Sequence, residues 1–119
     1  MKTFLALFTC AVNSKNHEAW KQLAPQVRQD RMEEGTRALE QWNEKYRNRI
    51  VFDGGSLGES TKIVDNTGIQ DVPSRMGAFL VVQADSHDEA AAIFKEHPHF
   101  ASFPGDGVEI LERSNSKRS

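Results

Sequence analysis

The chain has 119 residues, of which 38% are hydrophobic and 27% are charged, and its formal net charge is −2. This length fits one folded domain, and this composition argues against wholesale disorder. The weak net charge gives no strong field for nucleic acid or an anionic membrane surface, so we expect neither partner. The single cysteine, Cys10, excludes an intrachain disulfide and a cysteine-based zinc site.

The N-terminal segment predicts a strand over residues 3–12. Its apolar run from Phe4 to Phe8 is continuous rather than alternating, which indicates burial on both faces of a sheet. The run is shorter than the roughly 7–15 residues of a secretory signal core. No segment approaches the ~20 apolar residues that span a bilayer. We therefore expect a cytoplasmic protein that does not bind membranes.

Two helices are expected after this strand. Side chains from Asn13 to Asn16 can cap a short helix that ends before Pro25, and Pro25 suits the first turn of a longer helix that reaches about residue 48. Gly35 costs about 1 kcal/mol against alanine inside a helix, which close packing of the helix backbone against a sheet would explain. At spacings of three and four residues, one face of the long helix carries Met32, Gly35, Leu39, Trp42 and Tyr46.

The second half of the chain predicts more strands and one further helix. Ser86 and Glu89 form a capping box that opens this helix, and Pro98 ends it at His97 because the residue before a proline avoids the helical region. A loop over 99–107 follows. The expected strands cover residues 50–53, 60–65, 77–84 and 108–111, with a short hairpin partner at 69–72 that Pro73 ends.

The order β-α-β-β-α-β predicts an α+β protein with the ferredoxin-like fold, in which helices cover one face of a four-stranded antiparallel sheet. We expect a single domain over residues 1–113 and a disordered polar tail over 114–119. The strands at 3–12 and 77–84 are apolar on both faces, yet two helices can cover only one face. The other face would be an unusually large apolar patch, so we expect a homodimer with the sheets face to face.

Several short motifs of the chain belong together: His97-Pro98-His99-Phe100, Phe103-Pro104-Gly105, Val108-Glu109-Ile110, Asp53-Gly54-Gly55-Ser56-Leu57-Gly58 and Thr61-Lys62. These motifs resemble the YCII-related family, and the resemblance extends from Phe4 to Glu112. The resemblance implies a dimeric α/β barrel built from ferredoxin-like units, and small-molecule enzymes that use a His–Asp pair in a cleft between sheet and helices. One branch of the family has a Gly-Pro-Phe stretch where this chain continues with Gly55-Ser56.

His97, His99 and Asp53 are the candidate catalytic residues. A histidine that titrates near neutral pH can act as a general acid or base, and a carboxylate can orient it. The alternatives are a buried core histidine, a cation that stabilises a helix C-terminus, and an aspartate that caps the glycine turn after it. Two histidines at i, i+2 share a face only on a strand and lack an evident third ligand, so we expect no metal.

Lys62, Arg75 and Trp42 are the candidate ligand contacts. Lys62 or Arg75 would bind an anionic group such as a small organic acid, although such cations are usually solvated. Trp42 would line the pocket or, as helical spacing favours, belong to the core. We expect a small-molecule enzyme with cofactor-free acid/base chemistry. The alternative is a non-enzymatic ligand-binding or interaction module on the same homodimer, and a haem oxygenase lacks a ligand signal.

Overall fold

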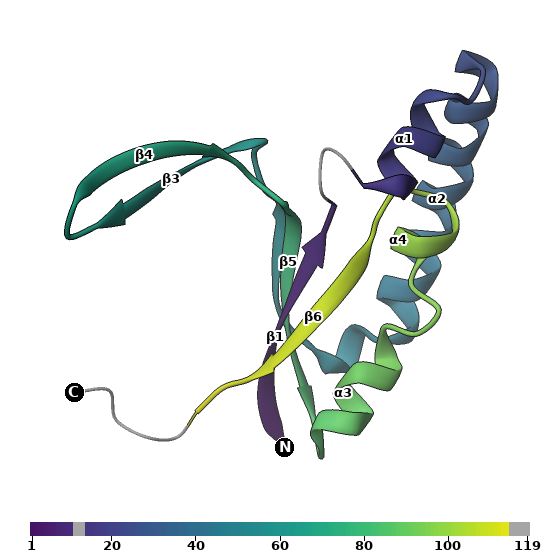
Figure 1. Ribbon diagram of the computed structural model, residues 1–119. Coiled ribbons are helices and arrows are strands. Elements are labelled where there is room, and N and C mark those ends of the chain that lie inside the picture. Colours follow the sequence, from purple (N-terminus) through teal and green to yellow (C-terminus); the bar gives the residue numbers. More distant parts are fainter. Residues whose placement is uncertain (11–13, 115–119) are drawn as a thin grey trace.

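The computed structural model describes residues 1–10 and 14–114 (Figure 1). Most of the expected disordered tail at 114–119, and the end of the first expected strand at 11–12, lie outside these residues. No helix in the described ranges is both long enough and apolar enough to cross a membrane. The elements are β1 (Lys2–Thr9), α1 (Lys15–Lys21), α2 (Pro25–Lys45), a short 3-10 helix η1 (Arg47–Arg49), β2 (Ile50–Ser56), β3 (Ser60–Asp65), β4 (Gly68–Pro73), β5 (Met76–Ala84), α3 (His87–Ile93), α4 (Pro98–Ala101) and β6 (Gly107–Glu112).

Four antiparallel strands form the main sheet in the order β2-β5-β1-β6. This is the strand order of the ferredoxin-like fold, in which the first strand of each β-α-β half occupies the sheet centre. Helices α2, α3 and α4 lie on one face of this sheet (Figure 1). The expected ferredoxin-like α+β architecture with an antiparallel sheet is therefore confirmed.

The central strand β1 separates a covered face from an open one. Phe4, Ala6 and Phe8 point toward the helices and are at most 4% exposed. Leu5, between them, points to the opposite face and is 36% exposed. The continuous apolar run in the sequence thus supplies side chains to both faces of the sheet, as expected. Within the described chain, however, helices cover only one of these faces.

The core lies between the sheet and the helices. Trp42 on α2 reaches into it and donates a hydrogen bond from Nε1 to the carbonyl of Ile93 at 3.1 Å. Gly35 is also buried, and the Phe103 ring packs on it so closely that a Cβ atom there would lie 2.5 Å from the ring. The expected close approach at Gly35 is therefore present, but the neighbour is an aromatic ring after α4 instead of the sheet.

The end of the second expected helix differs from the sequence interpretation. Ser86 caps α3 as expected, and its Oγ accepts a hydrogen bond from the Glu89 N–H at 3.1 Å. However, α3 ends at Ile93, and His97 is the N-cap of the new helix α4. The predicted helix up to His97 and the predicted loop from His99 are thus wrong at these residues, because Pro98 has the fixed φ that suits the first position of a helix.

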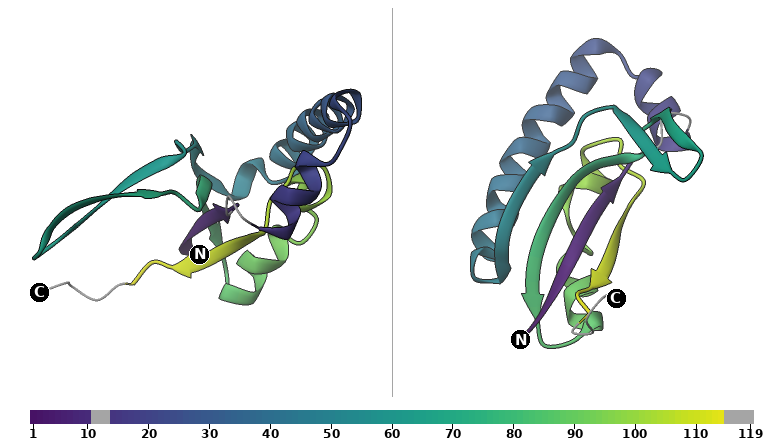
Figure 2. Two further views of the ribbon diagram at one scale, coloured as in Figure 1. Left: turned by 45° about the horizontal axis from the view of Figure 1, so that its top comes forward. Right: turned by 90° about the vertical axis from the view of Figure 1, so that its left-hand side faces the viewer.

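The hairpin of β3 and β4 leaves the main sheet and forms a sheet of its own, which we call the arm (residues 60–73). It projects away from the helices, beside the open face of the main sheet (Figures 1 and 2). Its tip turns at Gly68, whose φ of 134° favours glycine, and the Asp65 carboxylate accepts hydrogen bonds from Thr67. Pro73 pairs with Ser60 at the last position, so the hairpin extends one residue beyond the expected end at Val72.

Candidate active site

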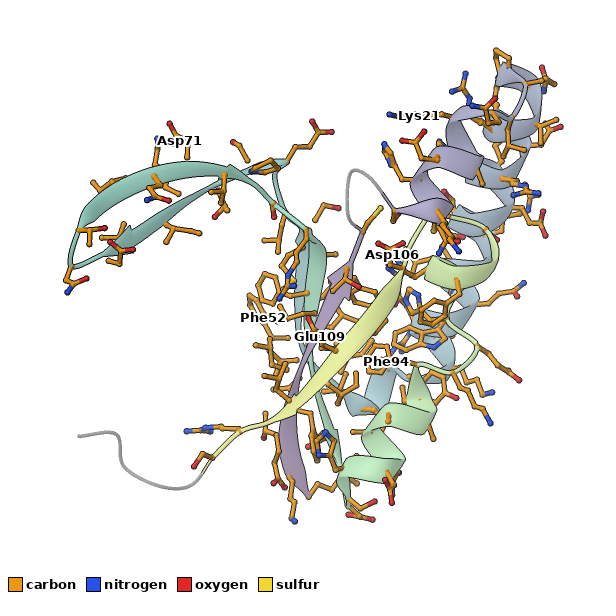
Figure 3. All side chains as sticks on the ribbon, viewed as in Figure 1. Lys21, Phe52, Asp71, Phe94, Asp106 and Glu109 are labelled. Carbon is orange, nitrogen blue, oxygen red and sulfur yellow. The ribbon has the colours of Figure 1, made fainter. Side chains whose placement is uncertain are left out.

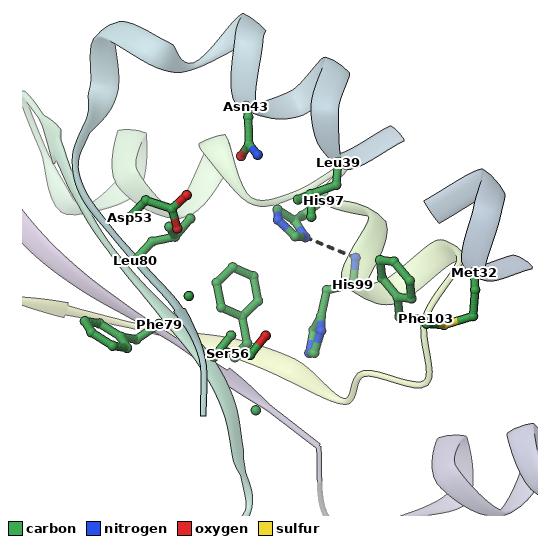
Figure 4. A pocket seen from close by; sticks show the side chains of 14 residues that line it. Met32, Leu39, Asn43, Asp53, Ser56, Phe79, Leu80, His97, His99 and Phe103 are labelled. Atoms are coloured by element: carbon green, nitrogen blue, oxygen red, sulfur yellow. Dashed lines mark hydrogen bonds between the residues drawn. The ribbon is translucent and has the colours of Figure 1, made fainter. Parts of the chain in front are cut away.

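A cavity of about 410 Å³ lies between the main sheet and the α2 and α4 side of the molecule (Figure 4). Its position follows from the fold, because the covered faces of β2 and β5 form its floor. A mostly apolar pocket with a few convergent polar groups is the usual form of a small-molecule site. The polar side chains that line it are Asn43, Asp53, Ser56, His97 and His99, and its larger apolar ones are Phe8, Met32, Leu39, Phe79, Leu80 and Phe103.

The orientation of His97 follows from its position as the N-cap of α4. Its Nδ1 accepts a hydrogen bond from the His99 backbone N–H at 3.0 Å. A nitrogen that accepts a hydrogen bond carries no proton, so the neutral ring has its hydrogen on Nε2. Trp42 and Phe8 hold the ring in place, with ring centroids 4.6 and 4.8 Å away.

His97 is uncharged at neutral pH. Burial in these apolar surroundings, and to a lesser extent the neighbouring His99, lowers the pKa of His97 to about 4. Its Nε2 is buried and has no hydrogen-bond partner within the described part of the chain. An unpartnered buried donor costs about 1–3 kcal/mol, so this nitrogen is an unusual feature of the pocket.

His99 also lines the cavity and is less buried than His97. Its Nε2 lies 3.0 Å from the Thr9 carbonyl, which can only accept, so this nitrogen carries the hydrogen of the neutral ring. Burial lowers the pKa of His99, although the Thr9 and Gly107 carbonyls and the Asp106 charge oppose this shift. The ring packs on Gly105, where a Cβ atom would collide with it. A hydrogen bond and a glycine contact thus fix this ring.

Asp53 faces the histidines from the other side of the cavity. It lies on β2, pairs in register with Leu80 of β5, and points toward the cavity, as do His97 and Asn43 (Figure 4). Among the described residues, no hydrogen bond between Asp53 and either histidine occurs. The expected catalytic residues therefore share one pocket, but the space between the carboxylate and the imidazoles is open to a ligand.

The structure places the three predicted ligand contacts outside this pocket. Lys62 lies on the arm, where its ammonium pairs with the Asp71 carboxylate at 2.5 Å, because residues 60–73 leave the main sheet. Arg75 is exposed at the base of the arm. Trp42 is only 6% exposed and contacts the pocket indirectly, through the His97 ring. The core alternative for Trp42 is therefore correct.

Sequence reasoning missed two polar residues of the pocket. Asn43 lies four residues after Leu39 on α2, so the pocket-facing side of the helix is wider than the apolar stripe alone suggests. Ser56 lines the pocket because β2 continues through Gly54 and Gly55, where a strand end was expected. The lining of this cavity, as far as the chain is described, includes no lysine or arginine. Arg47 lines a neighbouring hollow that shares Asn43 and Asp53 with it.

Possible metal ligands do not gather in the described residues. No group of three or more His, Cys, Asp or Glu side chains there has the arrangement of a metal site. Burial, and to a lesser extent the nearby Asp106 charge, raise the pKa of the Cys10 thiol, which disfavours the reactive thiolate. Its Sγ lies 3.0 Å from the Pro104 carbonyl, a contact typical of a structural cysteine.

The comparisons with known proteins bear on the fold. No family model matches the sequence, and no curated protein matches it. A solved structure of similar fold is 5-chloro-2-hydroxyhydroquinone dehydrochlorinase (TftG) from Burkholderia phenoliruptrix AC1100, in complex with 2,5-dihydroxybenzoquinone. The TM-score is 0.55 at 18% sequence identity, and the match covers 96% of this chain and 95% of that chain. The chain thus shares its α+β fold with a small-molecule enzyme.

Proposed function

We propose that this protein is a small-molecule enzyme of the YCII-related type that uses cofactor-free acid/base chemistry in the pocket between sheet and helices. One observation carries the proposal: His97, whose Nε2 is buried and unpartnered, lines an apolar cavity that Asp53 also lines. A donor and a proton acceptor on opposite walls can act on two atoms of one bound molecule. This arrangement is typical of a site for proton transfer.

The two residues have different roles in this proposal. With a pKa of about 4, His97 is a weak base at neutral pH, and its neutral Nε2–H instead donates a hydrogen bond to a ligand oxygen. Asp53 takes a proton from a carbon or oxygen of the ligand, and the charge that develops on the ligand oxygen is stabilised by His97. Asp53 then returns the proton to another ligand atom, or a leaving group departs. The reaction class is an isomerisation or an elimination.

The walls of the pocket favour a flat, oxygenated ring as the ligand. Phe8 and Phe103 offer aromatic contacts, and Asn43 and Ser56 offer further hydrogen bonds. A carboxylic acid fits less well, because Asp53 repels an anion and the lining described above has no cation. A hydroxylated hydroquinone, which is uncharged at neutral pH, meets these demands. TftG is named for a substituted hydroxyhydroquinone, which supports the use of such compounds as probes.

The test is a binding and turnover comparison. We expect a hydroxylated hydroquinone to raise the melting temperature and to titrate calorimetrically, whereas benzoate of similar size, which is an anion, does neither. His97→Phe, which removes the donor but keeps an aromatic ring, should weaken binding at least tenfold. Stronger binding of benzoate than of every hydroxylated ring would overturn the proposal, as would unchanged affinity in His97→Phe. Binding without any change of the ligand would instead favour the non-enzymatic alternative.

We further propose that the protein is a homodimer formed through the open face of the main sheet, as in a dimeric α/β barrel. This face is the one opposite the helices, and Leu111 on it is 47% exposed. Such a patch is larger than monomers usually leave in water. By strand register, the large apolar residues of the open face are Leu5, Leu7, Phe52, Phe79, Val81 and Leu111.

A further inference from the structure

The contacts within the described chain do not by themselves account for the stability of the arm. A lone two-stranded hairpin is at best marginally stable in water. The arm meets the main sheet at a neck, where Leu57 N–H bonds to the Gly77 carbonyl and Ser74 N–H to the Glu59 carbonyl, both at 2.9 Å. Beyond this neck it exposes large apolar side chains, and Ile63 is 46% exposed. Such an element is expected to pack against something.

The two sides of the arm face different surroundings. Asp71 points from the convex side, away from the space between the arm and the main sheet (Figure 3). Its cross-strand partner Lys62 shares that side, so the outer side carries the ion pair, together with the exposed apolar pair of Val64 and Ile69. Side chains alternate along a strand, and Ile63 and Val72 therefore lie on the concave, inner side. The inner side faces the space beside the open face.

The surface of the chain is large for its mass. A compact monomer of 13.4 kDa has an accessible surface of roughly 6500 Å², whereas this chain has 8645 Å². Its radius of gyration is 16.1 Å, against about 13.5 Å for a compact chain of this length. The excess surface is greater than the ~800 Å² per partner that a stable interface buries. The open face and the arm together offer enough surface for a partner.

The charges on the open face suit a second copy of the same chain. On β6 the open face carries Glu109, Leu111 and, by continued alternation, Arg113, so that acidic, apolar and basic side chains follow one another. Two such rows related by a two-fold axis place each acid opposite a base. Because the arm and the open face lie on the same side of one chain (Figure 1), the same axis brings each arm against the other copy.

We propose that the arm of each copy clasps the second copy, with the inner side around Ile63 and Val72 packed on the partner chain. This inference rests on the proposed homodimer and adds to it. The dimer would then have two kinds of contact, face to face between the sheets and clasping between each arm and the opposite chain. Burial of the inner side would also account for the stability of a hairpin that otherwise has only its own pairing.

The decisive experiment measures the dimer dissociation constant by sedimentation for the full chain and two matched variants. Ile63→Lys places a charge on the inner side, and Val64→Lys makes a similar change one residue away on the outer side. We expect a wild-type dimer, an increase of at least tenfold in the dissociation constant for Ile63→Lys, and less than a twofold change for Val64→Lys. Circular dichroism checks that each variant is folded.

The other outcomes separate the two proposals. A wild-type dimer that is equally stable in Ile63→Lys overturns the clasp and leaves the dimer through the open face intact. Equal weakening in both variants overturns the assignment of the inner side. A monomer at all concentrations overturns the clasp together with the homodimer, while the pocket chemistry stands on its own test.

Hydrogen exchange gives a second measurement in which the arm itself is unaltered. In the wild-type dimer we expect slow exchange of the arm amides, whereas in Leu5→Lys, which carries a charge on the open face, they should exchange at least tenfold faster. Equal exchange rates in the dimeric and the monomeric protein would contradict the clasp.

Discussion

The backbone N–H of His99 donates a hydrogen bond to Nδ1 of His97, and this bond of 3.0 Å joins the start of α4 to the pocket. Pro98 between them provides the first helical position without an N–H of its own. The same contact that begins the helix therefore fixes the tautomer of His97 and directs its Nε2–H into the cavity. Local folding and site chemistry depend on one hydrogen bond.

This relationship predicts a loss of stability in acid. Unfolded histidine takes up a proton below about pH 6.5, whereas His97 in the folded chain does so only near pH 4. Stability is therefore full above pH 6.5 and falls as the pH falls toward 4. Between pH 7.5 and pH 5.0, we expect His97 to contribute a loss of about 2 kcal/mol in the free energy of unfolding.

Urea unfolding at the two pH values checks this expectation. The control is His97→Asn, which retains a side chain able to cap α4 but does not titrate. Its loss of stability between the two pH values should be smaller than that of the wild type by about 2 kcal/mol. Parallel losses in the two proteins would show that His97 titrates normally in the folded state.

A second prediction concerns the contact between α2 and the Phe103 ring. Alanine normally stabilises a helix interior by about 1 kcal/mol over glycine. At Gly35, however, the added Cβ would lie 2.5 Å from the ring, which must move. We expect Gly35→Ala to destabilise the protein by about 1–2 kcal/mol net. Gly58→Ala, where the new Cβ meets no atom within 4 Å, is the matched control and should be neutral in thermal unfolding.

A third prediction separates binding from chemistry at Asp53. Asp53→Asn keeps the size of the side chain but removes the proton acceptor. We expect turnover of a hydroxylated ring to fall at least 100-fold, in line with general acid–base catalysis, while its dissociation constant changes less than threefold. Ser56→Ala, on the same strand, should change kcat far less. Full turnover by Asp53→Asn would remove Asp53 from the mechanism.

A fourth prediction tests the support behind His97. Trp42→Phe removes the hydrogen bond to the buried Ile93 carbonyl and part of the surface that holds the imidazole. We expect a loss of about 2–3 kcal/mol in the free energy of unfolding, since an unpaired carbonyl and a small cavity result. Chemical denaturation measures it. A loss below 1 kcal/mol would indicate that the core refills around the phenylalanine.

Much of the fold could be predicted because local patterns agree with the tertiary structure. The capping pair Ser86 and Glu89, the turn before Gly68 and the order of strands and helices all appear in the sequence as they do in the molecule. The pocket residues His97, His99 and Asp53 were expected as a group, because strand and helix ends of this fold converge on one cleft. Their acid and base roles remain proposals.

Other features depend on contacts between distant residues and could not be read locally. The sequence around Lys62 is that of any lysine on a strand. Lys62 lies outside the pocket because the arm leaves the main sheet. The low pKa of His97 arises from Trp42 and the aromatic residues around it, which are far apart in sequence. The short helix that begins at Pro98 depends on capping by the His97 side chain, and this ring is held in position only in the folded protein.

The edge-on packing of the Trp42 indole against the His97 ring gives the protein a built-in optical reporter. Indole emission responds to the electronic state of an adjacent imidazole, and protonation or hydrogen bonding at Nε2 alters that state. Occupancy of the cavity, and titration of its buried ring in acid, can therefore be followed as a change in intrinsic fluorescence without a label, with the half-buried Trp20 on α1 as a steady background.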